Sequence, residues 1–363
     1  MNNCLRISSW SIVAPIIAWL ILALSQLHLN LGSIESVLMA VGLVGAVLAA
    51  VHHAETIAHK LGEPYGTLLL ATSITVIEVG LILSLMLTGG PETAALARDT
   101  VFAAVMIILT GIVGLCLLIG GILYKEQVFK LHGANVSLST LAAIVVLTLI
   151  LPNYTLTTTG PIYSTSQLAF IALVSLVLYG SFVFVQAVRH RNYFLNATDN
   201  SEQYLDNQNK VTNMEAYVSA GLLLLSLIAV VLLAKSLAPT IEKFVLLIHA
   251  PHQLVGVIIA SIVLLPEGLA AVRAARKNMF QTSLNLALGS ALASIGLTIP
   301  AVAILSLITG WTLILGIDMK STVLLLLALF VNAISLATGR TNILQGVILL
   351  VVFGVYLFTT VVP

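Results

Sequence analysis

The chain has 363 residues, of which 59% are hydrophobic and only 8% are charged. A soluble domain is typically about 25% charged, so this composition excludes an ordinary water-facing surface and predicts a polytopic membrane protein. The formal net charge of +1 leaves no basic footprint, and we therefore expect no nucleic acid partner. Cys4 and Cys116 predict neither a disulfide framework nor a metal site.

Apolar stretches long enough to cross a bilayer recur along the chain. A helical span needs roughly 20 apolar residues, and helices satisfy their own backbone polar groups in lipid. We therefore predict an all-α protein with about eleven transmembrane helices. The predicted spans are residues 9–28, 34–53, 66–88, 100–123, 136–152, 166–188, 216–235, 248–272, 282–308, 321–338 and 342–361. The N-terminal "MNNCLRISSW" lacks a small-residue cleavage site, so we expect the first span to be retained.

The longest polar segment divides the predicted spans into two groups. Residues 189–215 are rich in Asn, Gln, Asp and Glu and are expected to form a linker loop. The resulting organisation is an extra N-terminal helix (1–33), a first half (34–188), the linker (189–215) and a second half (216–363).

The basic residues predict how the chain crosses the membrane. When the loops are numbered alternately, one side receives Arg6, Lys60, Lys125, Lys130, Arg189, Arg191, Lys210, Arg273, Arg276, Lys277 and Arg340. The other side receives Arg98, Lys235, Lys243 and Lys320. Cytoplasmic loops carry the excess of Lys and Arg. We therefore expect a cytoplasmic N-terminus, a cytoplasmic linker and a C-terminus on the opposite side of the membrane.

Two acidic residues lie within predicted spans rather than at their ends. Glu78 is in the third span, within "ATSITVIEVGLIL", and Glu267 is in the eighth, within "VLLPEGLAAV". An ionisable residue at membrane depth is by default a functional candidate. Five span steps separate the two, so their helices cross in opposite directions. Inverted repeats around a midplane site are a common plan for secondary transporters, and we predict two inverted five-helix repeats after the extra first helix.

Small and hydroxyl residues line the helix faces near these acids. Thr75 and Glu78 share a face of the third span, and Thr72 precedes them. In the ninth span a stripe is formed by Ser283, Ala287, Ser290, Ser294 and Thr298, with Gln281, Asn285 and Gly289 close to it. Such stripes also serve close helix packing alone. Beside two carboxylates they favour an oxygen-lined cation site.

The predicted chemistry is competition between cations and protons. Oxygen ligands suit hard cations, and two glutamates supply the charge that balances one divalent ion. We expect Glu78 and Glu267 to bind both cation and proton, with Thr72, Thr75, Gln281, Asn285 and Ser290 as accessory ligands. Pro266 is expected to break or kink the eighth helix and to free carbonyl groups for the ion. No cofactor is expected beyond the transported ions.

Two other functions stay open from the residues alone. His52, His53, Glu55 and His59 form "HHAETIAH", which allows a membrane-embedded metalloenzyme, although the spacing is not HExxH. Alternatively, the two acids could form the selectivity filter of a cation channel. Proton-coupled flux distinguishes an antiporter from both.

Three stretches carry a family resemblance. They are "HHAETIAHKLGEPYGTLLLATSITVIEVGLI", "PEGLAAVRAARKNMFQTSLNLALGSALASIGLTIP" and "TGRTNILQG". In the second, the steps from Glu267 to Gly289 and Ser290 match the family spacing. Together they resemble the calcium/cation antiporter superfamily in its proton-exchanging CAX branch, and within it the bacterial ChaA-type subgroup. One departure is that the Gly-Asn pair ahead of each acid is absent, with Ile74-Thr75 and Val263-Leu264 in its place.

The resemblance implies an eleven-span antiporter, not an enzyme, that exports Ca²⁺ or Na⁺, with K⁺ as a further candidate, in exchange for H⁺. The lipid bilayer and inorganic cations are its expected partners, and a homo-oligomer is compatible with it. The sequence leaves open the physiological cation, the proton stoichiometry, the oligomeric state and the role of residues 189–215.

Overall fold

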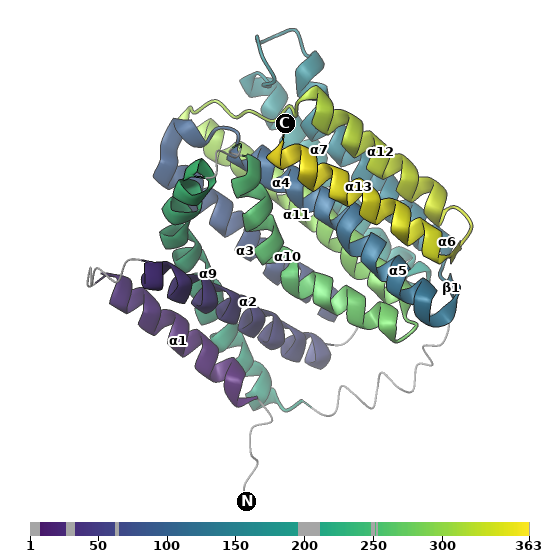
Figure 1. Ribbon diagram of the computed structural model, residues 1–363, viewed down its shortest axis with the longest axis horizontal. Coiled ribbons are helices and arrows are strands. Elements are labelled where there is room, and N and C mark those ends of the chain that lie inside the picture. Colours follow the sequence, from purple (N-terminus) through teal and green to yellow (C-terminus); the bar gives the residue numbers. More distant parts are fainter. Residues whose placement is uncertain are drawn as a thin grey trace, which may run out of the picture. The chain divides into compact units, whose positions relative to one another are not determined.

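The structure is a computed structural model, and it describes residues 8–26, 33–61, 65–194, 211–247, 251 and 253–362. In this part of the chain ten helices are long and apolar enough to cross a membrane, and a shorter apolar helix, α1 (Ser9–Gln26), precedes them. Figure 1 shows that helices make up almost all of the described part of the chain. The prediction of an all-α polytopic membrane protein is confirmed.

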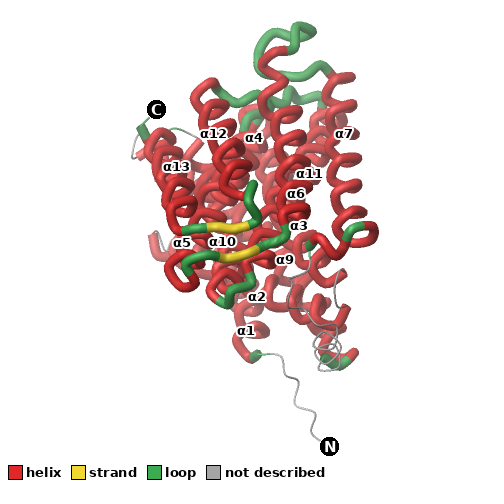
Figure 2. The backbone as a smooth tube through the Cα atoms, turned by 90° about the vertical axis from the view of Figure 1, so that its right-hand side faces the viewer, coloured by secondary structure: helices red, strands yellow, loops and turns green. Residues whose placement is uncertain are grey.

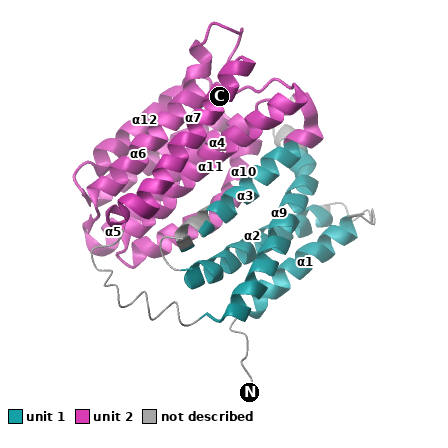
Figure 3. Cartoon of the chain, turned by 180° about the vertical axis from the view of Figure 1, so that it is seen from behind, with its two compact units in different colours: residues 1–85, 199–247 teal, residues 86–198, 248–363 magenta. Residues whose placement is uncertain are grey.

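The chain forms two compact units, which Figure 3 colours separately. The first unit holds residues 1–85 and 199–247. Its helices are α1, α2 (Ser33–Leu61), most of α3 (Tyr65–Gly89) and α9 (Asn213–Leu247). Helix α2 continues eight residues beyond the predicted end of its span at residue 53, through "AETIAHKL". The helix packs on α1 and α9.

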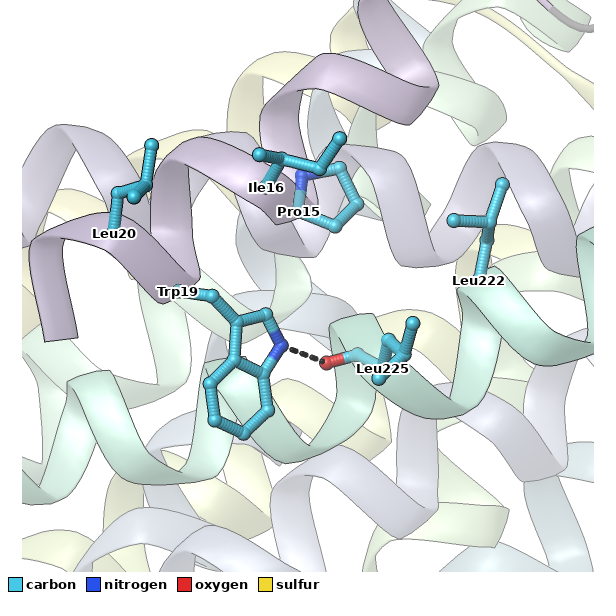
Figure 4. A pocket seen from close by; sticks show the side chains of 6 residues that line it. All are labelled: Pro15, Ile16, Trp19, Leu20, Leu222 and Leu225. Atoms are coloured by element: carbon cyan, nitrogen blue, oxygen red, sulfur yellow. Dashed lines mark hydrogen bonds between the residues drawn. The ribbon is translucent and has the colours of Figure 1, made fainter. Parts of the chain in front are cut away.

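An apolar pocket lies between α1 and α9 in the first unit (Figure 4). Trp19 Nε1 donates a hydrogen bond to the Leu225 carbonyl at 3.2 Å across it. The residues that line it are Pro15, Ile16, Trp19, Leu20, Leu222 and Leu225. No ionisable side chain is among them, so this pocket does not fit an inorganic ion.

The second unit holds residues 86–198 and 248–363. Its helices and strands, in chain order, are α4 (Leu96–Met106), α5 (Val113–Tyr124), β1 (Gln127–Val128), α6 (Leu131–Val145), α7 (Thr165–Phe184), α10 (Gln253–Arg276), α11 (Phe280–Thr309), α12 (Met319–Leu336), β2 (Arg340–Thr341) and α13 (Ile343–Val361). Helix α11 contacts α4, α5, α6, α7 and α10. It is therefore the central helix of this unit.

Three π-helical turns interrupt or extend the spans of the second unit. They are η2 (Ile107–Ile112), which joins α4 to α5 in one span, η3 (Val146–Ile150) after α6, and η5 (Val185–Arg189) after α7. Short 3₁₀ turns complete the chain at η1 (Gly90–Thr93), η4 (Leu151–Tyr154) and η6 (Arg191–Tyr193).

The expected break at Pro266 is wrong, because α10 runs as a single helix from Gln253 to Arg276. The alternative expectation, a kink at Pro266, stays a prediction. Proline removes one backbone donor, but neighbouring helices in a membrane bundle can satisfy the freed carbonyl group. The departure from regular α-helix lies instead at η2, in the span that packs beside α10.

A two-stranded β-ribbon links three connecting segments of the second unit, namely those between α5 and α6, between α10 and α11, and between α12 and α13. Strands β1 and β2 pair antiparallel, with Gln127 opposite Thr341, and Figure 2 shows them side by side. The buried Gln127 side chain donates to the Ala275 carbonyl and to Asn278 Oδ1, both at 3.1 Å. The turn between α10 and α11 is thereby fixed to the ribbon.

Candidate functional site

Glu267 and Ser290 form the best-defined polar contact inside the second unit. The Ser290 hydroxyl donates a hydrogen bond to Glu267 Oε2. Glu267 is 7% exposed and Ser290 is 5% exposed. Glu267 lies nine residues before the end of α10 and Ser290 ten residues after the start of α11. At a rise of about 1.5 Å per residue, the short turn between these helices brings the two side chains to the same level.

The rest of the predicted stripe on α11 is also buried. Ser283, Ala287, Ser294 and Thr298 are all at most 3% exposed. Together with Ser290 they follow at steps of three or four residues and share one face of α11, whose other faces are largely buried as well. Glu267 therefore lies against a helix face whose polar atoms are oxygens, and oxygen ligands suit hard cations and protons.

Gln281 and Asn285 lie on the same helix but have backbone partners. Gln281 Oε1 accepts a hydrogen bond from the Lys130 amide at 2.7 Å, and Gln281 Nε2 donates to Asn285 Oδ1 at 2.9 Å. Asn285 Nδ2 donates to the Phe194 carbonyl at 2.5 Å. The two residues lie about 13 Å and 7 Å from Ser290 along the helix axis. In this structure they connect α11 to the segments before α6 and after α7.

Glu78 lies in α3, within the first unit. Glu78 and Thr75 are each 3% exposed and share a face of the helix, since they are three residues apart. Thr72 is exposed. Glu78 and Glu267 thus belong to different compact units of the chain.

The histidine cluster has structural partners in the first unit. His53 is fully buried, and its Nε2 lies 3.0 Å from the Ser11 carbonyl oxygen. The His52 ring packs 5.3 Å from the Trp10 ring. Among the described residues, no group of three or more His, Cys, Asp or Glu side chains is placed to hold a metal ion. The sequence-based alternative of a zinc site gains no support here.

Asp99, in the first turn of α4, forms an ion pair at 2.8 Å with Arg98. Glu63, His249 and His252 lie outside the described residues.

A contact beside Glu267 was not predicted from the sequence. A Cβ atom at Gly268 would lie 3.3 Å from Cδ1 of Ile112, the last residue of the π-helical turn η2. The turn therefore packs directly on the backbone of the helix that carries the carboxylate.

Comparison with known proteins gives a consistent family. The sequence matches the family described as sodium/calcium exchanger protein over residues 32–188 and 218–362. It is 45% identical to y4hA of Sinorhizobium fredii, named as a candidate ionic transporter, covering 98% of this chain and 96% of that one. It is 34% identical to the sodium-potassium/proton antiporter ChaA of Escherichia coli, covering 96% and 95%.

The fold is also found among solved structures. The crystal structure of the H⁺/Ca²⁺ exchanger CAX matches with a TM-score of 0.73 and 15% identity, covering 96% of this chain and 87% of that one. At this identity the match shows a shared fold and nothing more.

Proposed function

The chain belongs to the sodium/calcium exchanger protein family and acts as a multi-pass cation/proton antiporter, and we propose that protons and cations compete for Glu78 and Glu267 as it does so. Two findings bear on which cation is transported: the matched family is described as sodium/calcium exchanger protein, and ChaA is named for Na⁺, K⁺ and H⁺. We propose export of Ca²⁺ or Na⁺, with K⁺ as a third candidate.

The observation that carries the proposal is the buried Glu267–Ser290 pair between α10 and α11. A low-dielectric environment disfavours a bare carboxylate, whereas a bound proton or an adjacent cation relieves that cost. Either ligand neutralises Glu267, and the two exclude each other. Exchange follows if the site opens to one side of the membrane at a time.

Glu78 and Thr75 are further proposed ligands, and they lie on α3 in the first unit. Both side chains are buried, as a ligand pair inside a membrane span requires. Thr72, Gln281 and Asn285 remain proposed accessory ligands. Before they could bind an ion, the Gln281 side chain would have to break its hydrogen bond with the Lys130 backbone N–H, and the Asn285 side chain its hydrogen bond with the Phe194 carbonyl.

We also propose inverted halves at residues 34–188 and 216–363, after the helix in 1–33 and around the linker 189–215. The two separate stretches matched by the family, 32–188 and 218–362, support this division. The distribution of Lys and Arg supports a bacterial inner-membrane location with the N-terminus in the cytoplasm and the C-terminus in the periplasm. Reporter fusions to each terminus test this orientation.

The test of the site is cation-driven proton movement in everted membrane vesicles that contain the full chain. Glu78→Gln and Glu267→Gln each remove a charge while keeping the side-chain shape, and we expect each to abolish exchange. Glu126→Gln is the matched control, because Glu126 is exposed and pairs only loosely with Arg340 at 3.8 Å. Near-normal exchange by either site variant, at normal protein levels, would refute the assignment. Cation flux that persists without proton movement would favour a channel.

A further inference from the structure

The π-helical turn η2 leaves a backbone acceptor without its usual helical partner. The Val113 amide donates to the Ile108 carbonyl, five residues earlier, instead of to Leu109 four residues earlier. Leu109 is fully buried. A buried carbonyl group without a donor is costly, so another group must supply one.

Asn332 of α12 supplies that donor. Its Nδ2 lies 3.0 Å from the Leu109 carbonyl oxygen and 2.8 Å from the Ala328 carbonyl oxygen. Asn332 is fully buried, and its Oδ1 has no hydrogen-bond partner among the described residues. Burying the unsatisfied Oδ1 costs free energy, and an apolar side chain would avoid this cost. The contribution of Asn332 therefore comes from the hydrogen bonds that its Nδ2 donates.

The turn held by Asn332 reaches the helix of Glu267. Ile112 ends the turn, and its Cδ1 lies 3.3 Å from the Cβ position of Gly268, the neighbour of Glu267. A side chain at position 268 would displace Ile112 or the helix. The chain of contacts is therefore Asn332 to the Leu109 carbonyl, through the turn to Ile112, and from Ile112 to Gly268.

We propose that Asn332 is a positioning residue for the Glu267 site. By holding the π-helical turn open, it sets where α10 presents the carboxylate to Ser290. π-helical turns occur frequently at functional sites. This inference rests on the proposed role of Glu267 in exchange, but Asn332 itself touches neither proton nor cation.

The test compares variants of the full chain, purified and reconstituted in proteoliposomes at equal amounts of monodisperse protein. Asn332→Leu removes the donor, and we expect the half-maximal cation concentration to rise roughly tenfold and the pH midpoint of exchange to shift. Asn332→Gln keeps an amide and should restore part of the loss. Thr322→Val is the matched control on α12, because this buried hydroxyl donates only to the Asp318 carbonyl of its own helix.

Gly268→Ala perturbs the contact between α10 and Ile112 from the α10 side. It provides a second test if Asn332→Leu does not fold. The added methyl group presses on Ile112, and we expect it to move the same two quantities. In the double variant the effects should be less than additive, because both act on one contact.

The inference is overturned if Asn332→Leu or Gly268→Ala lowers only the maximal rate, with the half-maximal concentration and the pH midpoint unchanged. Purely additive effects would also overturn it. Glu267→Gln, measured in parallel, separates the two claims. Normal exchange by Glu267→Gln would refute the proposed site itself. If Glu267→Gln loses exchange while Asn332→Leu behaves like the unchanged protein, only the role of Asn332 is refuted.

Discussion

Ser290 suits Glu267 because a hydroxyl group can both donate and accept a hydrogen bond. When Glu267 is ionised, Ser290 donates to it, as the structure shows. When Glu267 is protonated, the carboxyl group becomes a donor and the Ser290 oxygen can accept. The pair can therefore stay bonded through the exchange of a proton for a cation. A lysine at position 290 could not do this, since it has no acceptor.

We predict that Ser290→Ala weakens cation binding. Hydrogen bonds to charged groups contribute about 1.5–3 kcal/mol, so the half-maximal cation concentration should rise at least roughly tenfold. Ser290→Thr keeps the hydroxyl and should be milder. Ser306→Ala is the control on the same helix, because this hydroxyl caps the far end of α11 by donating to the Trp311 carbonyl. An unchanged cation dependence in Ser290→Ala would show that the hydroxyl only fills space.

The burial of the two acids was predictable, but their partners were predictable only in part. Isolated glutamates in long apolar runs have few places to lie except inside a bundle, and Glu78 and Glu267 are indeed buried. Ser290 followed from its 23-residue step from Glu267. Thr72 is exposed because six residues rotate it about 240° away from Glu78. The sequence could not show whether the Gln281 side-chain oxygen binds a cation or accepts a hydrogen bond from a backbone N–H, because the same oxygen serves either purpose.

Helices α5 and α13 show how two apolar elements pack in a membrane without a hydrophobic driving force between them. A Cβ atom at Gly346 of α13 would lie 2.4 Å from the Leu118 amide nitrogen of α5, and one at Gly121 of α5 would lie 2.8 Å from Ile343. The backbones therefore touch along the pair, which is the usual use of small residues in membrane helices.

We predict that Gly346→Ala separates these helices and destabilises the protein by about 1–3 kcal/mol, as overpacking against rigid backbone does. The measurement is thermal unfolding of the purified protein followed by loss of the monodisperse peak. Gly354→Ala is the matched control on α13, since no atom lies within 4 Å of its Cβ position. That variant should be neutral or slightly stabilising, because alanine favours a helix. Equal melting temperatures for both variants would contradict the close-packing argument.

The position of the spans was predictable, whereas their internal geometry was not. Apolar length alone located α3, α12 and α13 to within a few residues, since lipid imposes a minimum span. A π-helical turn changes only one step of the hydrogen-bond register, which leaves no trace in an apolar pattern. For that reason η2 and the role of Asn332 could not be found from sequence.

The whole chain requires a bilayer as its solvent. Phe170 on α7 and Phe358 on α13 are 63% and 65% exposed, and they are two of many large apolar side chains on the surface. In water such a surface would drive association, whereas lipid chains cover it without cost. Composition alone predicted this property. The assignment of Glu78 to one compact unit and Glu267 to the other was not predictable, because it depends on which helices pack together.

If protons and cations compete for Glu78 and Glu267 as proposed, cation affinity must depend on pH in a defined way. Protons that occupy Glu78 and Glu267 at low pH must leave before a cation binds. The half-maximal cation concentration should therefore rise as pH falls, with little change in maximal rate. By linkage, it rises roughly tenfold per pH unit for each proton displaced.

Exchange measured in proteoliposomes over a series of pH values tests this competition for Ca²⁺, Na⁺ and K⁺ separately. A limiting slope near −2 for the logarithm of that concentration against pH would mean that both carboxyl groups release a proton. A slope near −1 would mean that one does. Glu126→Gln should leave the slope unchanged, because that side chain is exposed and outside the site. If the half-maximal cation concentration did not depend on pH and only the maximal rate changed, protons and cations would not compete for the same groups. Such a result would show that protons and cations bind to different groups.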